Sequence, residues 1–94
     1  YEEEYLKLQC ENNNLEYDSV EQLQILQRKA EALFQRYPVR KELLKLLGDI
    51  SRKQGDTRNA IEMYYRCIRE SRNGVVCQAT KEIIESLEDR RKND

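Results

Sequence analysis

Apolar residues recur every three or four positions along most of this chain, the spacing that gathers side chains on one face of an α-helix. The clearest stripes are Leu23, Leu26, Ala30, Leu33 and Phe34, then Val39, Leu43, Leu46, Leu47 and Ile50, then Ile61, Tyr64, Tyr65 and Ile68. A last stripe of Val76, Ala79 or Thr80, Ile83 and Leu87 has heptad-like spacing. The pattern predicts helices over about 19–36, 39–54, 57–72 and 75–92.

Residues that stop or start helices lie between these stripes. Tyr37-Pro38 ends the first, because the residue before a proline avoids the helical region. Gly55 suits the left-handed conformation that closes a helix, and Asp56 or Thr57 can cap the next one. Asn73-Gly74 predicts a second glycine stop. The connections are short, which predicts an antiparallel array of helices.

The first 14 residues read as a separate segment. Asn12, Asn13 and Asn14 compete with a helix by bonding their own backbone, so the run predicts a break. Before it, Tyr5 and Leu8 recur at helical spacing, and after it Ser19 with Gln22 could form a capping box. We expect an acidic N-terminal arm or short helix over 1–14 and one helical domain over 15–94.

Composition supports an all-α class and argues against several functions. The 94 residues include one Pro, three Gly and no His, with 37% charged residues and a mean hydropathy of −0.97. Few turn residues and many helix formers favour helices, and no stretch reaches the roughly 20 apolar residues of a membrane span. Without histidine the commonest general base and zinc ligand are missing, so we expect no enzyme, metal site or cofactor.

The three cysteines, Cys10, Cys67 and Cys77, are scattered and odd in number. This spacing predicts reduced thiols and an intracellular protein, cytoplasmic or nuclear.

Charge is unevenly distributed along the chain. Residues 1–20 hold six acids against one base, a net of −5, and residues 39–72 hold nine bases against five acids, a net of +4. Such an imbalance can steer a partner, but it is small for a nucleic-acid domain.

One stretch carries a more specific pattern than amphipathicity. Within residues 41–74 it consists of Leu44, Leu47-Gly48, Gly55, Ala60, Tyr64 and Cys67. It resembles the tetratricopeptide repeat, a helical hairpin of about 34 residues with Leu-Gly in the first helix and Ala four positions before an aromatic residue in the second. Small residues at Gly48 and Ala60 would let the two helices approach, so we expect these two positions to face each other. Ser51 and Arg72 depart from the family's preferences.

The resemblance implies a fold and a function. The fold would be a short repeat array: a degenerate half repeat, one good repeat over 41–74 and a capping helix over 75–92. The first helices of such repeats line a groove that binds peptides or helices of partner proteins. The matching groove positions here are Glu42, Lys45, Asp49, Arg52 and Lys53. Cys67 would be an inert buried thiol.

We therefore expect a non-catalytic protein–protein interaction module, a scaffold domain of a larger protein. Two alternatives remain open at this point. An unfinished apolar end of a short array could be covered by a second copy, which would make the chain a homodimerisation domain. A nucleic-acid-binding helical domain is the less favoured alternative, with Tyr65, Arg66 and Arg69 as its exposed candidates.

Overall fold

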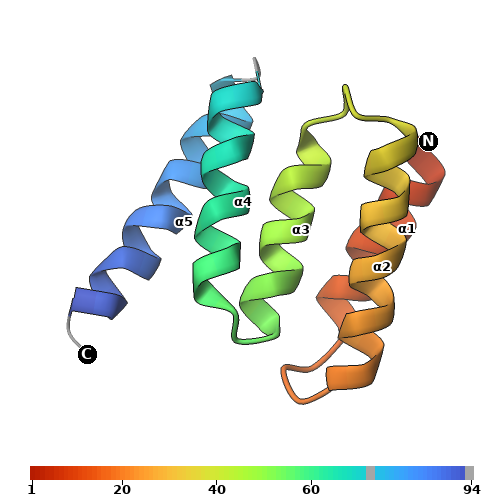
Figure 1. The fold of residues 1–94 in the computed structure, drawn as a ribbon, viewed down its shortest axis with the longest axis horizontal. Coiled ribbons are helices and arrows are strands. Elements are labelled where there is room, and N and C mark those ends of the chain that lie inside the picture. The colour runs from red at the N-terminus through yellow and green to blue at the C-terminus, as the bar shows by residue number, and fades with distance from the viewer. Residues whose placement is uncertain (72–73, 93–94) are drawn as a thin grey trace.

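The structure, a computed structural model, describes residues 1–71 and 74–92. Within them the chain forms five α-helices and no strand, which confirms the expected all-α class. The helices are α1 (Glu2–Asn14), α2 (Val20–Arg36), α3 (Glu42–Lys53), α4 (Thr57–Glu70) and α5 (Gly74–Lys92). Short connections reverse the chain direction between neighbouring helices (Figure 1).

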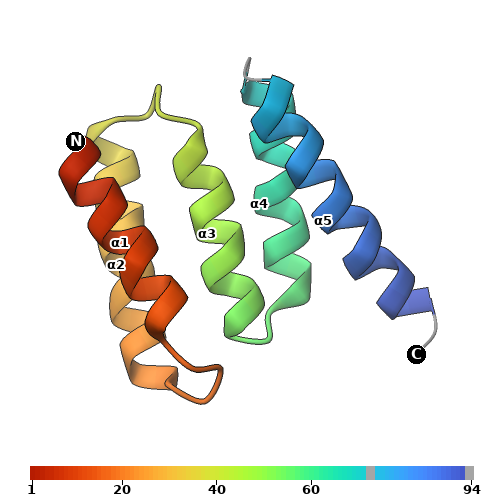
Figure 2. The ribbon, with the colours of Figure 1, turned by 180° about the vertical axis from the view of Figure 1, so that it is seen from behind.

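The helices form a flat assembly in which each packs mainly on its neighbours in sequence. α2, α3 and α4 lie side by side, α1 lies against α2 and α3, and α5 lies against α4 (Figures 1 and 2). The principal extents are 38, 33 and 18 Å. α1 and α5 are therefore at opposite ends of the assembly, and α3 is the helix that connects the two halves.

Most of the predicted helix ends are found, with local differences. Gly55 has a φ of 82°, the left-handed conformation expected between α3 and α4. The Asp56 side chain caps α4 by accepting the backbone N–H of Asn59 at 3.1 Å. Ser19 precedes α2 but makes no side-chain cap hydrogen bond, so the predicted capping box is wrong.

Three further expectations concern single positions. Val39 was expected on the apolar face of a helix starting at 39, but α3 begins at Glu42 and Val39 is 80% exposed in the preceding turn. Gly74 opens α5 rather than ending α4. Arg72, noted above as a departure from the repeat family, lies outside the described residues, and so does Asn73 of the predicted Asn73-Gly74 stop. The side chains of Val76 and Ala79, from the last apolar stripe, are also outside them.

The predicted break at the asparagine run is wrong. α1 continues through Asn14, and its end comes at Leu15, whose backbone N–H donates to the Glu11 carbonyl at 3.1 Å. Asn12 points inward and is buried rather than forming a turn. α1 remains helical through the asparagine run because Leu8 packs into the core and because α3 binds the carbonyls at the end of α1, as described below.

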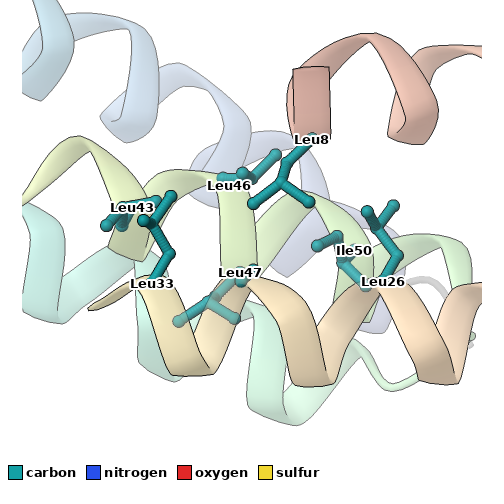
Figure 3. Packing of buried hydrophobic residues seen from close by; sticks show 8 residues of the cluster. Leu8, Leu26, Leu33, Leu43, Leu46, Leu47 and Ile50 are labelled. Atoms are coloured by element: carbon teal, nitrogen blue, oxygen red, sulfur yellow. The ribbon is translucent and has the colours of Figure 1, made fainter. Parts of the chain in front are cut away.

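Two apolar clusters hold the helices together. The larger, shared by α1, α2 and α3, consists of Leu8, Leu26, Ala30, Leu33, Leu43, Leu46, Leu47 and Ile50. Figure 3 shows the side chain of Leu8 directed from α1 into this cluster, beside Leu46 of α3. The smaller, shared by α4 and α5, consists of Ala60, Ile61, Tyr64, Ile84 and Leu87.

The close approach of α3 and α4 occurs at Gly48. A Cβ placed on Gly48 would lie 2.5 Å from Cε1 of Tyr64, with two further atoms of the same ring within 2.9 Å. The expectation that Gly48 faces Ala60 therefore needs correction, because the nearest group is the Tyr64 ring, one turn further along α4. Ala60 is fully buried and belongs to the cluster with α5.

Candidate interaction face on α3

The five positions proposed for partner binding form one row along α3, which we call the α3 polar row: Glu42, Lys45, Asp49, Arg52 and Lys53. All five side chains are half-buried rather than fully exposed. Glu42, Lys45 and Asp49 follow one another at three or four residues, and Arg52 and Lys53 lie three and four residues after Asp49, so neighbours meet on one helix face. Each of them also contacts another charged or polar group of the same chain.

Asp49 is the centre of the row. Its carboxylate lies 3.2 Å from Lys45 Nζ and 3.8 Å from Arg52 Nη2, one turn away on either side. The hydroxyl of Tyr64 also donates to Asp49 Oδ1, reaching it across Gly48. Burial, and then the adjacent Asp49 charge, raise the pKa of the Tyr64 phenol above its ordinary value.

Glu42, at the start of α3, is bound by α1. Tyr1 donates its hydroxyl to Glu42 Oε1 at 2.6 Å, and its ring stacks on Tyr5 at 5.9 Å between centroids. The guanidinium of Arg40 lies 4.9 Å from the Tyr1 ring centre, within cation–π range. Burial raises the pKa of both tyrosine hydroxyls; the next cause is the hydrogen bond to Glu42 for Tyr1 and the charge of Glu42 for Tyr5.

Lys53, at the end of α3, is also bound by α1. Its ammonium donates to the backbone carbonyls of Asn12 and of Leu15, the latter at 2.9 Å. These carbonyls lie at the C-terminal end of α1, where carbonyl groups have no partner within the helix and the dipole favours a cation. α1 has no basic residue of its own in its last turn, so Lys53 supplies that charge from α3.

The row is consequently divided between two uses. α1 occupies Glu42 and Lys53 at its ends, whereas the Lys45, Asp49 and Arg52 side chains in the middle are 28%, 18% and 39% exposed. The middle part is the part of the row whose charges make no contact with α1 or Tyr1. Tyr1 and Asn12 were absent from the predicted site, and the helical spacing of Tyr1, Tyr5 and Leu8 was the signal that could have placed them against α3.

Most of the residues that carried the family resemblance are buried, and Gly55 is exposed in the turn between α3 and α4. Leu44, Ala60, Tyr64 and Cys67 are fully buried, and Leu47 is nearly so. Buried Cys67 is consistent with the expected structural role of its thiol, whereas Cys10 is exposed on α1.

Tyr65 was named above as an exposed candidate for nucleic-acid binding. It is 44% exposed, and its hydroxyl donates to Glu88 of α5 at 2.8 Å.

Two shallow hollows lie outside the α3 polar row, along the outer side of the α1–α2 pair. They measure about 330 and 300 Å³ and share Glu11 and Lys29 in their linings. The exposed Ile25 side chain borders the second hollow, together with Leu15 and Leu26.

Among the described residues, no group of three or more acidic or cysteine side chains is arranged to hold a metal ion. None of the described helices has the length and apolar character needed to cross a bilayer. In comparisons with known proteins, no family model, no curated protein and no solved structure matches the chain.

Proposed function

We propose that this chain is a non-catalytic protein–protein interaction module, a scaffold domain similar to a short tetratricopeptide array that binds a peptide or helix of a partner. The observation that carries the proposal is the α3–α4 hairpin. All its signature residues except Gly55 are buried, and its Tyr64 hydroxyl fixes Asp49 between Lys45 and Arg52. The family places its ligand on the same positions.

The exposed middle of the α3 polar row suits an acidic or amphipathic segment. Lys45 and Arg52 supply two positive charges around one Asp49, so the group has a net positive charge. Charges of this kind increase the association rate and select partners more than they increase affinity. The partner would therefore contribute carboxylates to this face and apolar contacts nearby.

The test is affinity capture with the purified chain, followed by binding measurements with the captured protein. Reversing Lys45 and Arg52 to Glu should slow association and reduce its dependence on salt. The matched control reverses Arg28 and Lys81, exposed bases on α2 and α5, so that net charge changes equally. Because the reversed chain places two carboxylates beside Asp49, Lys45→Gln with Arg52→Gln serves as a milder version that removes the two cations without adding this repulsion. Equal binding by all variants would remove this face as the site.

A homodimerisation domain is the second candidate, and one observation favours it. Ile25 is 51% exposed on α2 at the edge of the 300 Å³ hollow, an apolar position that a second copy could cover. A dimer would show a concentration-dependent doubling of mass by light scattering, and Ile25→Glu should abolish it. Val39→Glu, at a more exposed apolar position in the 37–41 turn, is the control. The mass of a monomer at every concentration would eliminate this candidate.

A further inference from the structure

The surface beneath α1 has an apolar centre and a basic rim. Its centre is the cluster of α2 and α3 side chains into which Leu8 is inserted (Figure 3). Four basic residues surround this centre, and each contacts α1 or a residue at its ends: Lys29, Arg36, Arg40 and Lys53. Glu42, which accepts from Tyr1, is the one acidic contact described above. Lys29 lies 4.0 Å from Glu11, and Arg36 lies 3.4 Å from Glu4. Such a surface complements an acidic amphipathic helix.

α1 itself supplies the chemistry that this surface accepts. It carries four Glu and one Lys, a net charge of −3. Its contacts are made by Tyr1, Tyr5 and Leu8, spaced i, i+4 and i+7, which places them on one helix face. The direction of the helix is also specified, because Arg40 meets the ring at its N-terminal end and Lys53 binds the carbonyls at its C-terminal end.

α1 is held more weakly than the other helices in contact with the same cluster. Only Leu8 and Asn12 of its 13 residues are buried, against four residues of α2 and seven of α3. Asn12 Oδ1 is buried without a hydrogen-bond partner among the described residues, which opposes docking. The two ion pairs to α2 are solvent-exposed, and such pairs contribute little.

We propose that α1 is a displaceable internal ligand, and that the surface it covers binds an acidic helix of a partner protein in the same direction. The partner helix would present an aromatic residue, a second aromatic four residues later and a leucine three residues after that. Its last carbonyls would accept from Lys53, and its carboxylates would meet Lys29 and Arg36. This inference goes beyond the proposed function, because the surface beneath α1 is separate from the Lys45, Asp49 and Arg52 face proposed above.

The experiment uses the full chain and a fluorescent peptide with the sequence of residues 1–18, in which Cys10 is replaced by Ser. In the full-chain variant Leu8→Asp, α1 should leave the cluster, and the peptide should then bind at least about tenfold more tightly than to the unchanged chain, because a docked α1 reduces the competent fraction. Leu6→Asp is the matched control, since Leu6 is 57% exposed on the same helix. A peptide carrying Leu8→Asp should not bind any of the chains.

Hydrogen exchange of the same samples establishes that each variant is folded and that α1 has opened. Should Leu8→Asp fail to fold, Tyr5→Ala removes a half-buried contact of α1 and gives a milder opening. Adding Lys53→Met to the opened chain should weaken peptide binding, because the carbonyls at the helix end lose their donor.

Three results would overturn the inference. The peptide could fail to bind a folded chain whose α1 amides exchange rapidly, or it could bind all three chains equally. The opened chain could also double its mass, which would make a second copy the occupant. Because the peptide measurement needs no captured partner, its failure is distinguishable from failure of the proposed function, which the Lys45 and Arg52 reversals test separately.

Discussion

Gly48 is the residue at which α3 and α4 come closest. Replacing it with Ala would place a methyl group 2.5 Å from the Tyr64 ring, which is fully buried and held by its hydroxyl. The overlap should outweigh the gain of about 1 kcal/mol in helix propensity, so we expect a net loss of about 1–2 kcal/mol in the free energy of unfolding. Chemical denaturation provides the measurement.

A double-mutant cycle identifies the cause of that loss. In a Tyr64→Leu background the ring is absent, so Gly48→Ala should be neutral or stabilising. If Gly48→Ala is equally destabilising in both backgrounds, the ring is not what requires glycine.

The hydroxyl of Tyr64 gives a second prediction for a single residue. Tyr64→Phe removes the hydrogen bond to the Asp49 carboxylate, which retains Lys45 and Arg52 as partners. We therefore expect a loss of about 1–2 kcal/mol in the free energy of unfolding near neutral pH. Asp49 would also be less constrained, which should lower affinity for a partner at the α3 polar row. Denaturant unfolding measures the first effect.

The same variant should change the response to alkaline pH. The folded-state pKa of Tyr64 is raised above its ordinary value of 10.0, so its stabilising contribution is complete below that pH and is lost as the pH rises above it. Unfolding free energies at about pH 8 and about pH 11 should therefore differ less in Tyr64→Phe than in the unchanged chain. An identical decrease in both would assign the alkaline loss to other groups, such as Tyr1 and Tyr5, whose pKa values are also raised.

Among the elements, α1 depends on a residue outside itself. Lys53→Met keeps the length of the side chain but removes the donor to the two carbonyls at the end of α1. We expect about 1–2 kcal/mol less protection of the α1 amides in hydrogen exchange, with little change in α4. Lys7→Met, at an exposed position on α1, is the control for loss of one charge. Equal effects of the two variants would show that only net charge matters.

The elements also show what a sequence can predict here. Apolar spacing, Pro38 and Gly55 were enough to locate four helices, because these signals act within a few residues. The asparagine run misled because its local preference was overcome by packing of Leu8 and by Lys53, which is 41 residues away from Asn12. The α3 polar row was predicted from the groove positions of the repeat family. The binding of its two end residues, Glu42 and Lys53, by the α1 segment depends on tertiary contacts that no local sequence pattern contains.

The molecule as a whole has two cores that should respond separately to mutation. Leu87 is buried between α4 and α5, whereas Leu26 is buried among α1, α2 and α3. Leu87→Ala should cost about 2–4 kcal/mol and increase exchange mainly in α5, because neighbouring helices in such assemblies are stabilised locally. Leu26→Ala should instead increase exchange in α1 and α2. Equal loss of protection in all five helices for both variants would mean that the chain unfolds as one unit.

The arrangement in which each helix packs mainly on the helices before and after it also determines how the chain reaches this structure. Contacts between sequence neighbours require only short loops to close, so little chain entropy is lost before packing begins. Folding should accordingly take microseconds to milliseconds, as in other helical domains of low contact order. Either end of the chain could begin the process, and a nascent chain could order α1 to α3 before α5 has left the ribosome.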